Sequence, residues 1–403
     1  MDKAVCHPTN VLRRKVVILG STGSIGTNAL DVVAYLPDRL DVIGLSAHSR
    51  VDLLLEQAIK YRPRWIAVTD PAARRGIDPA ALPAGCELLT GPAVLARKVA
   101  EPEVDVVLSA IVGAAGLEST WAALEAGKTI AVANKETLVM AGPLVTELAA
   151  KRGGRLLPVD SEHSAVFQAL QGAAADAVER IVLTGSGGPF RGRSRADLQK
   201  VTPAEALQHP TWKMGPKITV DSATLMNKAL EVIEARWLFD LPPERIDVII
   251  HPESVIHSFV EFKDGSVLAQ LSPPDMRLPI QYALTYPDRV PGPSRRLAWR
   301  ELAGWHFEQP DHETFPSLQL GYEVARRGGT CGAVLNAANE AAVERFLAGE
   351  LDFLDIPRVC RAALDAHNFS PTPTLAELSV CDRWARQEVF RWNSPKPRSV
   401  RTP

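Results

Sequence analysis

The chain has 403 residues, of which 46% are hydrophobic and 23% are charged, and its formal net charge at pH 7 is −2. A chain of this length is too long for a single hydrophobic core, so we expect two or three domains. The nearly balanced charge excludes a general nucleic-acid surface or a surface for anionic membranes, and any anion site must be local.

The cysteines and the apolar runs predict the compartment. The five cysteines are scattered and none forms a C-x-x-C pair, which favours free thiols in a reducing environment over a disulfide framework or a zinc site. No apolar run has the length of a signal peptide before the first predicted strand, or of a transmembrane helix after it. We therefore expect a cytoplasmic protein that binds neither nucleic acid nor a membrane.

Residues 15–26, KVVILGSTGSIG, predict a strand followed by a glycine-rich turn, and TNALDVVAYL then continues as a helix. Glycines in such a turn allow backbone N–H groups to approach a pyrophosphate at the helix N-terminus, which predicts a dinucleotide site. The spacing of Gly20, Gly23 and Gly26 is GxxGxxG and not GxGxxG. A tight turn between strand and helix, without a ligand, is therefore the alternative.

The second predicted strand, LDVIGLSAHSR, ends without the acidic residue that usually binds the ribose 2′-hydroxyl of NAD. Hydroxyl and cationic groups stand there instead, and such groups favour a 2′-phosphate. The strand end therefore predicts NADP(H) as the cofactor, and a polar loop is the alternative. The residues concerned are Ser46, His48, Ser49 and Arg50.

Strand and helix patterns continue to alternate: RWIAVTD, VDVVLSAIVGAAG and KTIAVANKETLVMAG begin as strands, and STWAALEAG is helical. This alternation predicts a parallel, doubly wound sheet with its ligand at the C-terminal ends of the strands. Loops 110–116 and 134–136 follow such strands. Asn134, Lys135 and Glu136 are therefore placed to contact cofactor or substrate, although a loop lysine is often only solvated.

The segment RLLPVDSEHSAVFQAL predicts a strand that ends in Asp160 and Glu162, followed by a helix. Two carboxylates two residues apart at a strand end point the same way, which suits a hard divalent cation such as Mg²⁺ or Mn²⁺. Glu231 would complete a set of three acids. Capping of the helix N-terminus by the acids, or by Ser161 and Ser164, is a strong alternative.

Two loops that follow carry further polar groups. RIVLTGSGGPF is a strand that opens into a loop with Ser186 and three glycines, which suits a phosphate, with a structural turn as the alternative. Residues 205–217 contain an aromatic residue between prolines and predict a flap that closes over substrate, with a buried tryptophan as the alternative. The flap residues of interest are His209, Trp212, Met214 and Gly215.

From Ser222 onward the chain predicts a helix with two unlike faces. Asn227, Lys228 and Glu231 are three or four residues apart and share one face, which suits an anionic, oxygen-rich ligand and a metal. The alternative is a solvated face with a Lys228–Glu231 ion pair. Apolar residues recur at helical spacing and form the expected buried stripe: Met226, Leu230, Ile233 and Trp237.

The last third of the chain predicts a hairpin, a linker and helices. Alternating residues on both sides of the KDG turn, after residue 250, indicate the antiparallel hairpin, and Met276 in SPPDMRLPI is expected to face a pocket. We predict an NADPH-binding domain over 1–159, a catalytic and dimerisation domain over 160–290, a linker over 291–318 and a C-terminal helical domain over 319–403.

Taken in order, these motifs resemble the 1-deoxy-D-xylulose 5-phosphate reductoisomerase family over nearly the whole chain. The motifs are GSTGSIG, AIVGAAGL, ANKETLV, VDSEHSAVFQ, LTGSGGPF, HPTWKMGPKITVDSATLMNKALE, HPESVIHS, PDMRLPI and LNAANE. The resemblance implies an α/β fold with a Rossmann-like N-terminal sheet, an α+β catalytic domain, a small C-terminal helical bundle and a homodimer. It also implies NADPH- and metal-dependent isomerisation and reduction of 1-deoxy-D-xylulose 5-phosphate, a small phosphorylated sugar, to 2-C-methyl-D-erythritol 4-phosphate in non-mevalonate isoprenoid synthesis.

The resemblance also implies roles for matching residues. NADPH would be held at its pyrophosphate and neighbouring groups by Thr22, Gly23, Ser24, Ile25, Asn134, Glu136 and Gly215, with Gly20 in the same turn. Asp160, Glu162 and Glu231 would bind Mg²⁺ or Mn²⁺, with Co²⁺ as a third choice.

The resemblance places the substrate as well. The substrate hydroxyls and carbonyl would lie by Lys135, Ser161 and Glu162, and its phosphate by Ser186, Ser222, Asn227 and Lys228. The flap residues His209, Trp212 and Met214 would close over it. The chain departs from the family at His48–Arg50, where a Gly-x-Asn-like turn is expected, although Arg50 supplies a suitable cation.

Two other functions stay open from the sequence. An ordinary NADP-dependent semialdehyde or hydroxy-acid dehydrogenase would share the first domain but would need no acidic set at 160, 162 and 231. A non-catalytic NADP-sensing protein would need no dense set of polar residues over 209–231. Dependence on a divalent metal separates the first of these from a reductoisomerase, and oxidation of NADPH with the phosphorylated pentulose separates the second.

Overall fold

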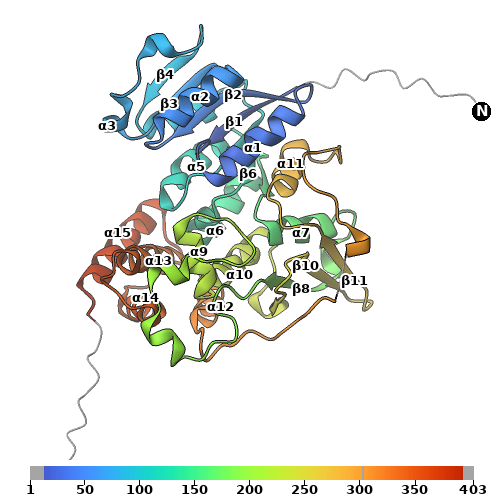
Figure 1. Ribbon diagram of the computed structural model, residues 1–403, viewed down its shortest axis with the longest axis vertical. Helices are drawn as coiled ribbons and strands as arrows, with labels where there is room; N and C mark the ends of the chain where they lie inside the picture. The colour runs from blue at the N-terminus through green and yellow to red at the C-terminus, as the bar shows by residue number, and fades with distance from the viewer. Residues whose placement is uncertain (1–12, 302–303, 394–403) are drawn as a thin grey trace, which may run out of the picture. The chain divides into compact units, whose positions relative to one another are not determined.

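The computed structural model describes residues 13–301 and 304–393 (Figure 1). These residues divide into two compact units. Unit 1 is formed by the chain up to residue 137, by 142–181 and by 255–304, and unit 2 by 138–141, by 182–254 and by the chain from 305 onward. Cys6 and the start of the predicted N-terminal domain lie outside the described residues. The domain boundaries predicted from sequence stay a prediction.

Unit 1 is built on a parallel sheet of seven strands in the order β4-β3-β2-β1-β5-β6-β7. Every neighbouring pair in it is parallel, and the order reverses beside β1, so the predicted doubly wound sheet is confirmed. The apolar run Val16–Leu19 in β1 has no exposed surface, as expected of a strand covered on both faces. The strands are β1 (Arg14–Leu19), β2 (Leu40–Ala47), β3 (Trp65–Val68), β4 (Glu87–Thr90), β5 (Val106–Ser109), β6 (Thr129–Val132) and β7 (Arg155–Pro158).

The helices that connect successive strands of this sheet are α1 (Ser24–Tyr35), α2 (Val51–Tyr61), α3 (Pro71–Arg74), α4 (Ala93–Val99), α5 (Leu117–Glu125) and α6 (Lys135–Arg152). Helix α7 (Ser161–Ala169) follows β7, and α11 (Arg277–Thr285) comes after the last strand in the described residues. Helix α6 has a kink at Ala141 (φ −133°, ψ 23°), two residues before Pro143, because proline removes a helical hydrogen bond and crowds the preceding turn. The predicted loop 134–136 is wrong, because Asn134 caps α6 and the next two residues form its first turn.

A second sheet has the strand order β11-β10-β8-β9, with β8 (Val178–Gly185), β9 (Ile246–Ile250), β10 (Ile256–Phe262) and β11 (Val267–Leu271). The division between the units falls within β8. Strands β10 and β11 are antiparallel, so the hairpin predicted around the KDG turn is confirmed. Gly265 takes a left-handed φ of 85° in that turn, and the Asp264 carboxylate accepts a hydrogen bond from the Ser266 N–H.

Unit 2 contains the C-terminal helices that the sequence predicts. They are α12 (Ser317–Arg327), α13 (Cys331–Leu347), α14 (Ile356–Ala366) and α15 (Leu375–Arg391), and Figure 1 shows α13, α14 and α15 gathered in red. Helix α13 is buried along most of its length and packs against the other three. A capping box between Thr374 and Glu377 begins α15. Short 3-10 helices lie at Pro79–Ala81, Ala114–Gly116, Ala175–Ala177, Asp197–Lys200, Pro243–Arg245, Trp299–Glu301 and Phe353–Asp355.

The segment that follows the predicted flap forms two helices and not one. Helix α8 (Pro203–Ala206) ends within the predicted flap 205–217, α9 (Pro216–Ala223) begins within it, and α10 (Met226–Leu238) is separate from α9. The predicted single helix from Ser222 onward is wrong because Leu225 takes a left-handed φ of 58° and ends the run. The apolar stripe of α10 is confirmed at Met226, Leu230 and Ile233, which are buried, whereas Trp237 is half-buried. Of the helices in the described ranges, none has both the length and the apolar character that crossing a bilayer demands.

Candidate active site

The turn between β1 and α1 is shaped for the approach of a ligand's anionic group. Gly20 takes a left-handed φ of 79°, and a Cβ there would lie 2.6 Å from the Ala110 carbonyl oxygen. A Cβ at Gly26 would lie 2.4 Å from the Gly20 carbonyl oxygen, so the first turn of α1 packs directly on the strand end. Gly23 is the N-cap of α1 and provides no side-chain cap. The first N–H groups of this helix are therefore oriented toward any anion that binds in the turn.

The polar groups at the end of β2 lie beside this turn. Arg50 donates from Nη1 to the Thr22 carbonyl at 2.7 Å, and His48 Nδ1 lies 2.9 Å from Thr69 Oγ1. His48, Ser49 and Arg50 are all exposed. The cation predicted for the 2′-phosphate of NADP(H) is thus next to the glycine-rich turn, and its contact with that phosphate stays a prediction.

Asn134 holds the end of β6 against the neighbouring strand connection. Its Nδ2 donates to the carbonyls of Ile111 and Gly113, the latter at 3.0 Å, and its Oδ1 accepts from the Thr137 N–H at 2.9 Å. The same amide donates to Glu136 Oε2 at 3.2 Å. Asn134 and Glu136 are buried, so both polar groups are satisfied and fixed at the C-terminal edge of the sheet. Their predicted NADPH contacts stay a prediction.

Asp160 lies at the centre of a buried charged cluster in unit 1. Its Oδ2 pairs with Lys135 Nζ at 2.7 Å, and its Oδ1 lies 3.1 Å from His163 Nδ1. Burial acts to raise the pKa of Asp160, but the charges of Lys135 and His163 outweigh it and hold that pKa well below the ordinary value. His163, fully buried one turn after Asp160, was not among the predicted site residues, although its helical spacing signals the contact.

Asp160 and Glu162 do not lie together on a strand end, so that part of the prediction is wrong. Glu162 lies in the first turn of α7 and not on a strand, so the alternation of strand side chains does not orient it. Asp160 is the N-cap and accepts from the Glu162 N–H at 3.2 Å, which confirms the capping alternative for Asp160. Ser161 donates from Oγ to Glu162 Oε2, and both side chains are half-buried. Asp160 and Glu162 therefore present adjacent carboxylates at one helix N-terminus.

In unit 2, the loop after β8 packs on the end of α9. Gly187 and Gly188 have left-handed φ values of 84° and 69°, and a Cβ at Gly188 would lie 2.7 Å from the Ser222 carbonyl oxygen. Lys228, on α10, reaches back to donate to the Thr184 carbonyl, and a Cβ at Gly185 would lie 3.1 Å from its Cε. The loop that carries Ser186 thereby lies against α9 and α10, where the other predicted phosphate residues are.

His209 connects the predicted flap to this loop. Its Nδ1 accepts from the N–H groups of Thr211 at 3.1 Å and Trp212 at 2.9 Å, so in the neutral ring the proton is assigned to Nε2. Nε2 lies 3.0 Å from Ser186 Oγ and donates to it. Burial lowers the pKa of His209, which favours this neutral form.

The flap is only partly exposed to solvent. Trp212 and Met214 are half-buried and Gly215 is exposed, so neither the exposed nor the buried alternative for the tryptophan holds in full. Closure of residues 205–217 over a substrate stays a prediction.

The polar face of α10 is buried. Lys228 is 4% exposed and Glu231 has no exposed surface, so the solvated face considered from sequence is wrong, although the Lys228–Glu231 ion pair of that alternative does form. Asn227 donates from Nδ2 to Glu231 Oε1 at 2.6 Å. Within unit 2 the helix packs against α9, α12 and β9, and Lys228 lies against Thr184 and Gly185 of β8. Glu231 belongs to unit 2 and the other two acids to unit 1, so their assembly around one metal stays a prediction.

Met276 has apolar neighbours in unit 1. It precedes α11 and is half-buried against the hydrophobic core of unit 1. Its side chain contributes to the packing of that core, and its contact with a substrate stays a prediction.

A buried polar network that sequence reasoning missed anchors α9. Asp221 is 1% exposed; its Oδ1 accepts from Asn339 Nδ2 of α13 at 2.7 Å, and its Oδ2 pairs with Lys217 Nζ at 2.9 Å. The four-residue spacing of Lys217 and Asp221 signals the ion pair, but nothing local signals an asparagine 118 residues away. Helix α9, which carries Ser222, is thereby tied to the C-terminal bundle.

We expect Asp221→Asn to lower the free energy of unfolding by about 3 kcal/mol, because removing one partner of a buried pair leaves the other charge poorly compensated. Urea unfolding followed by circular dichroism measures the change. Asp240→Asn is the matched control: Asp240 pairs with Arg236 at the same spacing, but its side chain is 97% exposed, and less than about 1 kcal/mol is expected. Equal losses of unfolding free energy in the two variants would contradict a structural role for the buried network.

Three family profiles match the chain in succession. The profile described as 1-deoxy-D-xylulose 5-phosphate reductoisomerase matches residues 16–142, and the profile of the C-terminal domain of that family matches residues 156–239. A third, described as the DXP reductoisomerase C-terminal domain, matches residues 271–388. Together the three profiles match segments of both units.

Whole-chain relatives agree with the profiles. The chain is 54% identical to the 1-deoxy-D-xylulose 5-phosphate reductoisomerase of Symbiobacterium thermophilum over 379 residues, which is 93% of this chain and 97% of the relative. It is 48% identical to the Rhodopirellula baltica protein of the same name, with 94% of each chain covered.

Solved structures show the same similarity. A DOX-P reductoisomerase in complex with NADPH, fosmidomycin and magnesium is 40% identical, with a TM-score of 0.88 over 94% of this chain and 98% of that one. The Zymomonas mobilis enzyme in complex with NADPH is 42% identical, with the same TM-score and coverage. From its glycine-rich turn to its C-terminal bundle, the chain belongs to the 1-deoxy-D-xylulose 5-phosphate reductoisomerase family.

Proposed function

We propose that this chain isomerises and reduces 1-deoxy-D-xylulose 5-phosphate to 2-C-methyl-D-erythritol 4-phosphate, with NADPH and a divalent metal. The observation that carries the proposal is similarity over the full length: 54% identity across 93% of the chain to a protein of that name. The fold matches an enzyme solved with NADPH, fosmidomycin and magnesium at a TM-score of 0.88. An NADP-dependent dehydrogenase that resembled this chain only in the first domain would not match it over both units.

The residues of unit 1 fit NADPH. Glycine is required at positions 20 and 26, because a Cβ at either would overlap backbone atoms, and the uncapped N-terminus of α1 offers N–H groups to a pyrophosphate. Arg50 is fixed beside that turn by its bond to the Thr22 carbonyl and supplies the cation that a 2′-phosphate needs. The absence of an acid at the end of β2 is consistent with NADPH and not NADH.

The acidic residues fit a hard divalent cation. Asp160 and Glu162 present carboxylate oxygens at one helix N-terminus, and Asp160 stays ionised because its pKa lies well below the ordinary value. When bound, the cation polarises the carbonyl and hydroxyl oxygens of the substrate. Mg²⁺ and Mn²⁺ both suit oxygen donors, with Co²⁺ as a third choice. Lys135 is held against Asp160 and would border the substrate hydroxyls together with Ser161.

The phosphate end of the substrate would be held in unit 2. Backbone N–H groups of the loop after Ser186, the hydroxyls of Ser186 and Ser222, and the buried ammonium of Lys228 suit a phosphate. His209 of the flap donates a hydrogen bond to Ser186 Oγ. A phosphate bound to Ser186 would therefore be linked to the flap through this one serine–histidine hydrogen bond. Binding energy from a group remote from the reacting carbons would then orient the substrate and favour flap closure.

The decisive experiment is the oxidation of NADPH by the purified chain with 1-deoxy-D-xylulose 5-phosphate and Mg²⁺. We expect turnover with this substrate and none with 1-deoxy-D-xylulose, which lacks the phosphate. A chain that binds NADPH but oxidises none of it would instead be an NADP-sensing protein.

We expect Lys228→Ala to raise the KM for the sugar phosphate by about tenfold to 100-fold, because a charge-assisted hydrogen bond contributes about 1.5–3 kcal/mol. Steady-state kinetics with varied substrate at saturating NADPH measure it. Lys200→Ala removes an exposed cation outside the flap and serves as the control, with KM unchanged. An unchanged KM in Lys228→Ala, in a variant that circular dichroism shows to be folded, would contradict the phosphate assignment.

The assembly and compartment also belong to the proposal. Strand β11 is the edge of its sheet, and Val267 and Leu268 on it are 54% and 50% exposed, which supports pairing with a second copy in a homodimer. Sedimentation equilibrium tests this against the 43.7 kDa chain mass. The described cysteines Cys86, Cys331, Cys360 and Cys381 are all free thiols, which supports a reducing, cytoplasmic location.

A further inference from the structure

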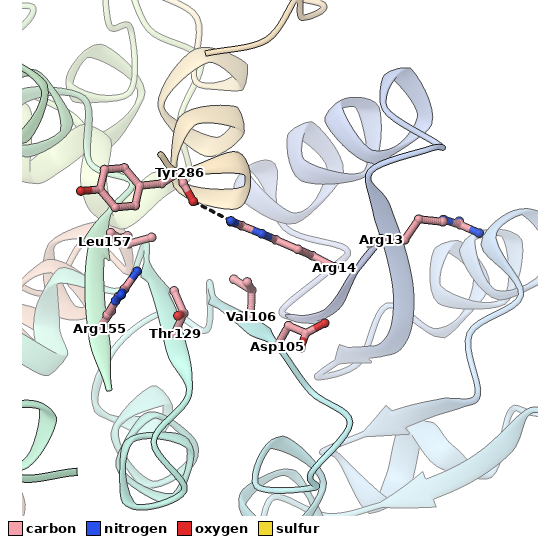
Figure 2. Close-up of a pocket in the computed structure, with 8 residues that line it drawn as sticks. All are labelled: Arg13, Arg14, Asp105, Val106, Thr129, Arg155, Leu157 and Tyr286. Atoms are coloured by element: carbon pink, nitrogen blue, oxygen red, sulfur yellow. Dashed lines mark hydrogen bonds between the residues drawn. The ribbon is translucent and has the colours of Figure 1, made fainter. Parts of the chain in front are cut away.

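Unit 1 has a cavity of about 310 Å³ that the proposed function does not use (Figure 2). Its lining includes Arg14, Val106, Thr129 and Arg155, which are the first residues of β1, β5, β6 and β7. The cavity therefore lies at the edge of the parallel sheet where these strands begin. The glycine-rich turn follows the other end of β1, so the two sites are at opposite edges of one sheet.

One wall of the cavity is a fixed guanidinium. Arg14 donates from Nη1 to the Leu284 carbonyl at 3.0 Å. Its Nη2 donates to the Tyr286 carbonyl at 2.7 Å (Figure 2). Arginine has five N–H donors, so these two bonds orient the group and leave others for a ligand. A half-buried guanidinium that is already ordered loses little conformational entropy when an anion binds.

The facing wall provides a second guanidinium. Arg155 is exposed, and within residues 13–301 and 304–393 its side chain has neither a hydrogen-bond nor an ion-pair partner. Figure 2 shows Arg14 and Arg155 both extending toward Tyr286. The Thr129 side chain lies on the same wall as Arg155 and adds a hydroxyl.

The charge balance of the cavity favours an anion. Asp105 also lines it, but its Oδ2 accepts from the Lys15 N–H at 2.8 Å. Within the described ranges, Asp105 forms no ion pair with Arg14 or Arg155. Arg13 is part of the lining, although its side chain points away from the cavity in Figure 2. The two guanidiniums are thus left without an opposing carboxylate of their own.

We propose that this cavity is a second anion site, for a small molecule that carries a phosphate or a carboxylate group held between Arg14 and Arg155. Planar guanidiniums bind both kinds of oxyanion through paired hydrogen bonds. The cavity has the volume of a small-ligand pocket, so the anion can belong to a metabolite and not only to a free ion. Because its walls are strand starts, a ligand here would contact four strands of the sheet.

Calorimetric titration tests the site with two probes, inorganic phosphate and malonate. The titrations use the Lys228→Ala chain, so that the proposed substrate-phosphate site contributes least. Adding Arg155→Ala to that background is expected to weaken binding by about tenfold or more, the effect of losing a charge-assisted bond. Arg152→Ala removes an exposed arginine three residues away that does not line the cavity and should leave binding unchanged.

The outcomes separate the sources of the ligand. Binding of phosphate alone identifies a phosphorylated ligand, and binding of malonate alone identifies a carboxylate. Affinities that are the same with and without Arg155, or that fall equally in Arg152→Ala, would overturn the proposal. If the Lys228→Ala chain is poorly folded, Arg155→Ala and Arg152→Ala are compared in the unsubstituted chain. Loss of one phosphate-binding site in Arg155→Ala, but not in Arg152→Ala, would then support the proposal. Turnover of the sugar phosphate should not change in Arg155→Ala.

Discussion

EDTA should abolish the oxidation of NADPH by this chain with 1-deoxy-D-xylulose 5-phosphate, and added Mg²⁺ or Mn²⁺ should restore it. The expected loss is about 1000-fold, because polarisation of substrate oxygens by a divalent cation contributes several kcal/mol to the transition state. Asp160 remains ionised at neutral pH, with its pKa held well below the ordinary value, so the carboxylate is ready to bind a cation. Steady-state rates across a titration of free metal measure the effect.

The same experiment discriminates between the remaining functions. EDTA already saturated with Mg²⁺ is the control and should leave the rate unchanged. Quenching of tryptophan fluorescence by NADPH should persist in EDTA, because the glycine-rich turn and Arg50 that serve the nucleotide contain no acidic ligand. Full activity in EDTA would instead indicate a dehydrogenase that transfers hydride without a metal.

Much of unit 1 was predictable from sequence because its signals are local. Short apolar runs separated by helical patterns predict parallel strands, and the sheet has that form. The glycines at 20 and 26 are needed for backbone contacts of their own turn, so the motif reports the geometry directly. The KDG hairpin is equally local.

The failures of prediction involve contacts that are distant in sequence. The break at Leu225 has no glycine or proline to signal it, and the weak helix propensity of the β-branched residues before it, such as Thr219, Val220 and Thr224, does not locate it. Asp221 meets a partner 118 residues away. Lys228 and Glu231 are buried by tertiary packing, and helical periodicity alone cannot distinguish a buried polar face from a solvated one.

Two of the alternatives weighed from sequence proved to be compatible with the functional interpretation. Asp160 is both a helix cap and a carboxylate held ionised by neighbouring cations. Lys228 and Glu231 form an ion pair, yet both are buried where an uncompensated charge would be costly. Each charge compensates the other on this buried face, and bound ligands would take over that compensation. Phosphate for Lys228 and metal for Glu231 would do so at the same time.

Glu231→Gln should lower kcat by about 100-fold or more while leaving NADPH binding within about twofold, because a neutral amide of the same shape is a poor ligand for a hard cation. Gln can still accept the Asn227 bond at Oε1, so the shape of the face is kept. The concentration of Mg²⁺ required for half-maximal rate should rise in the same variant. Steady-state kinetics over a Mg²⁺ titration measure both effects.

Glu234→Gln is the matched control, since Glu234 is on the same helix, is 1% exposed and undergoes the same chemical change. It should retain the Mg²⁺ requirement of the unsubstituted chain. Thermal unfolding of both variants separates a fault in folding from one in metal binding, because loss of the Lys228 ion pair also affects stability. If Glu231→Gln turned over normally, Glu231 would be only the counter-ion of Lys228, and the metal would be left with the two carboxylates at the start of α7.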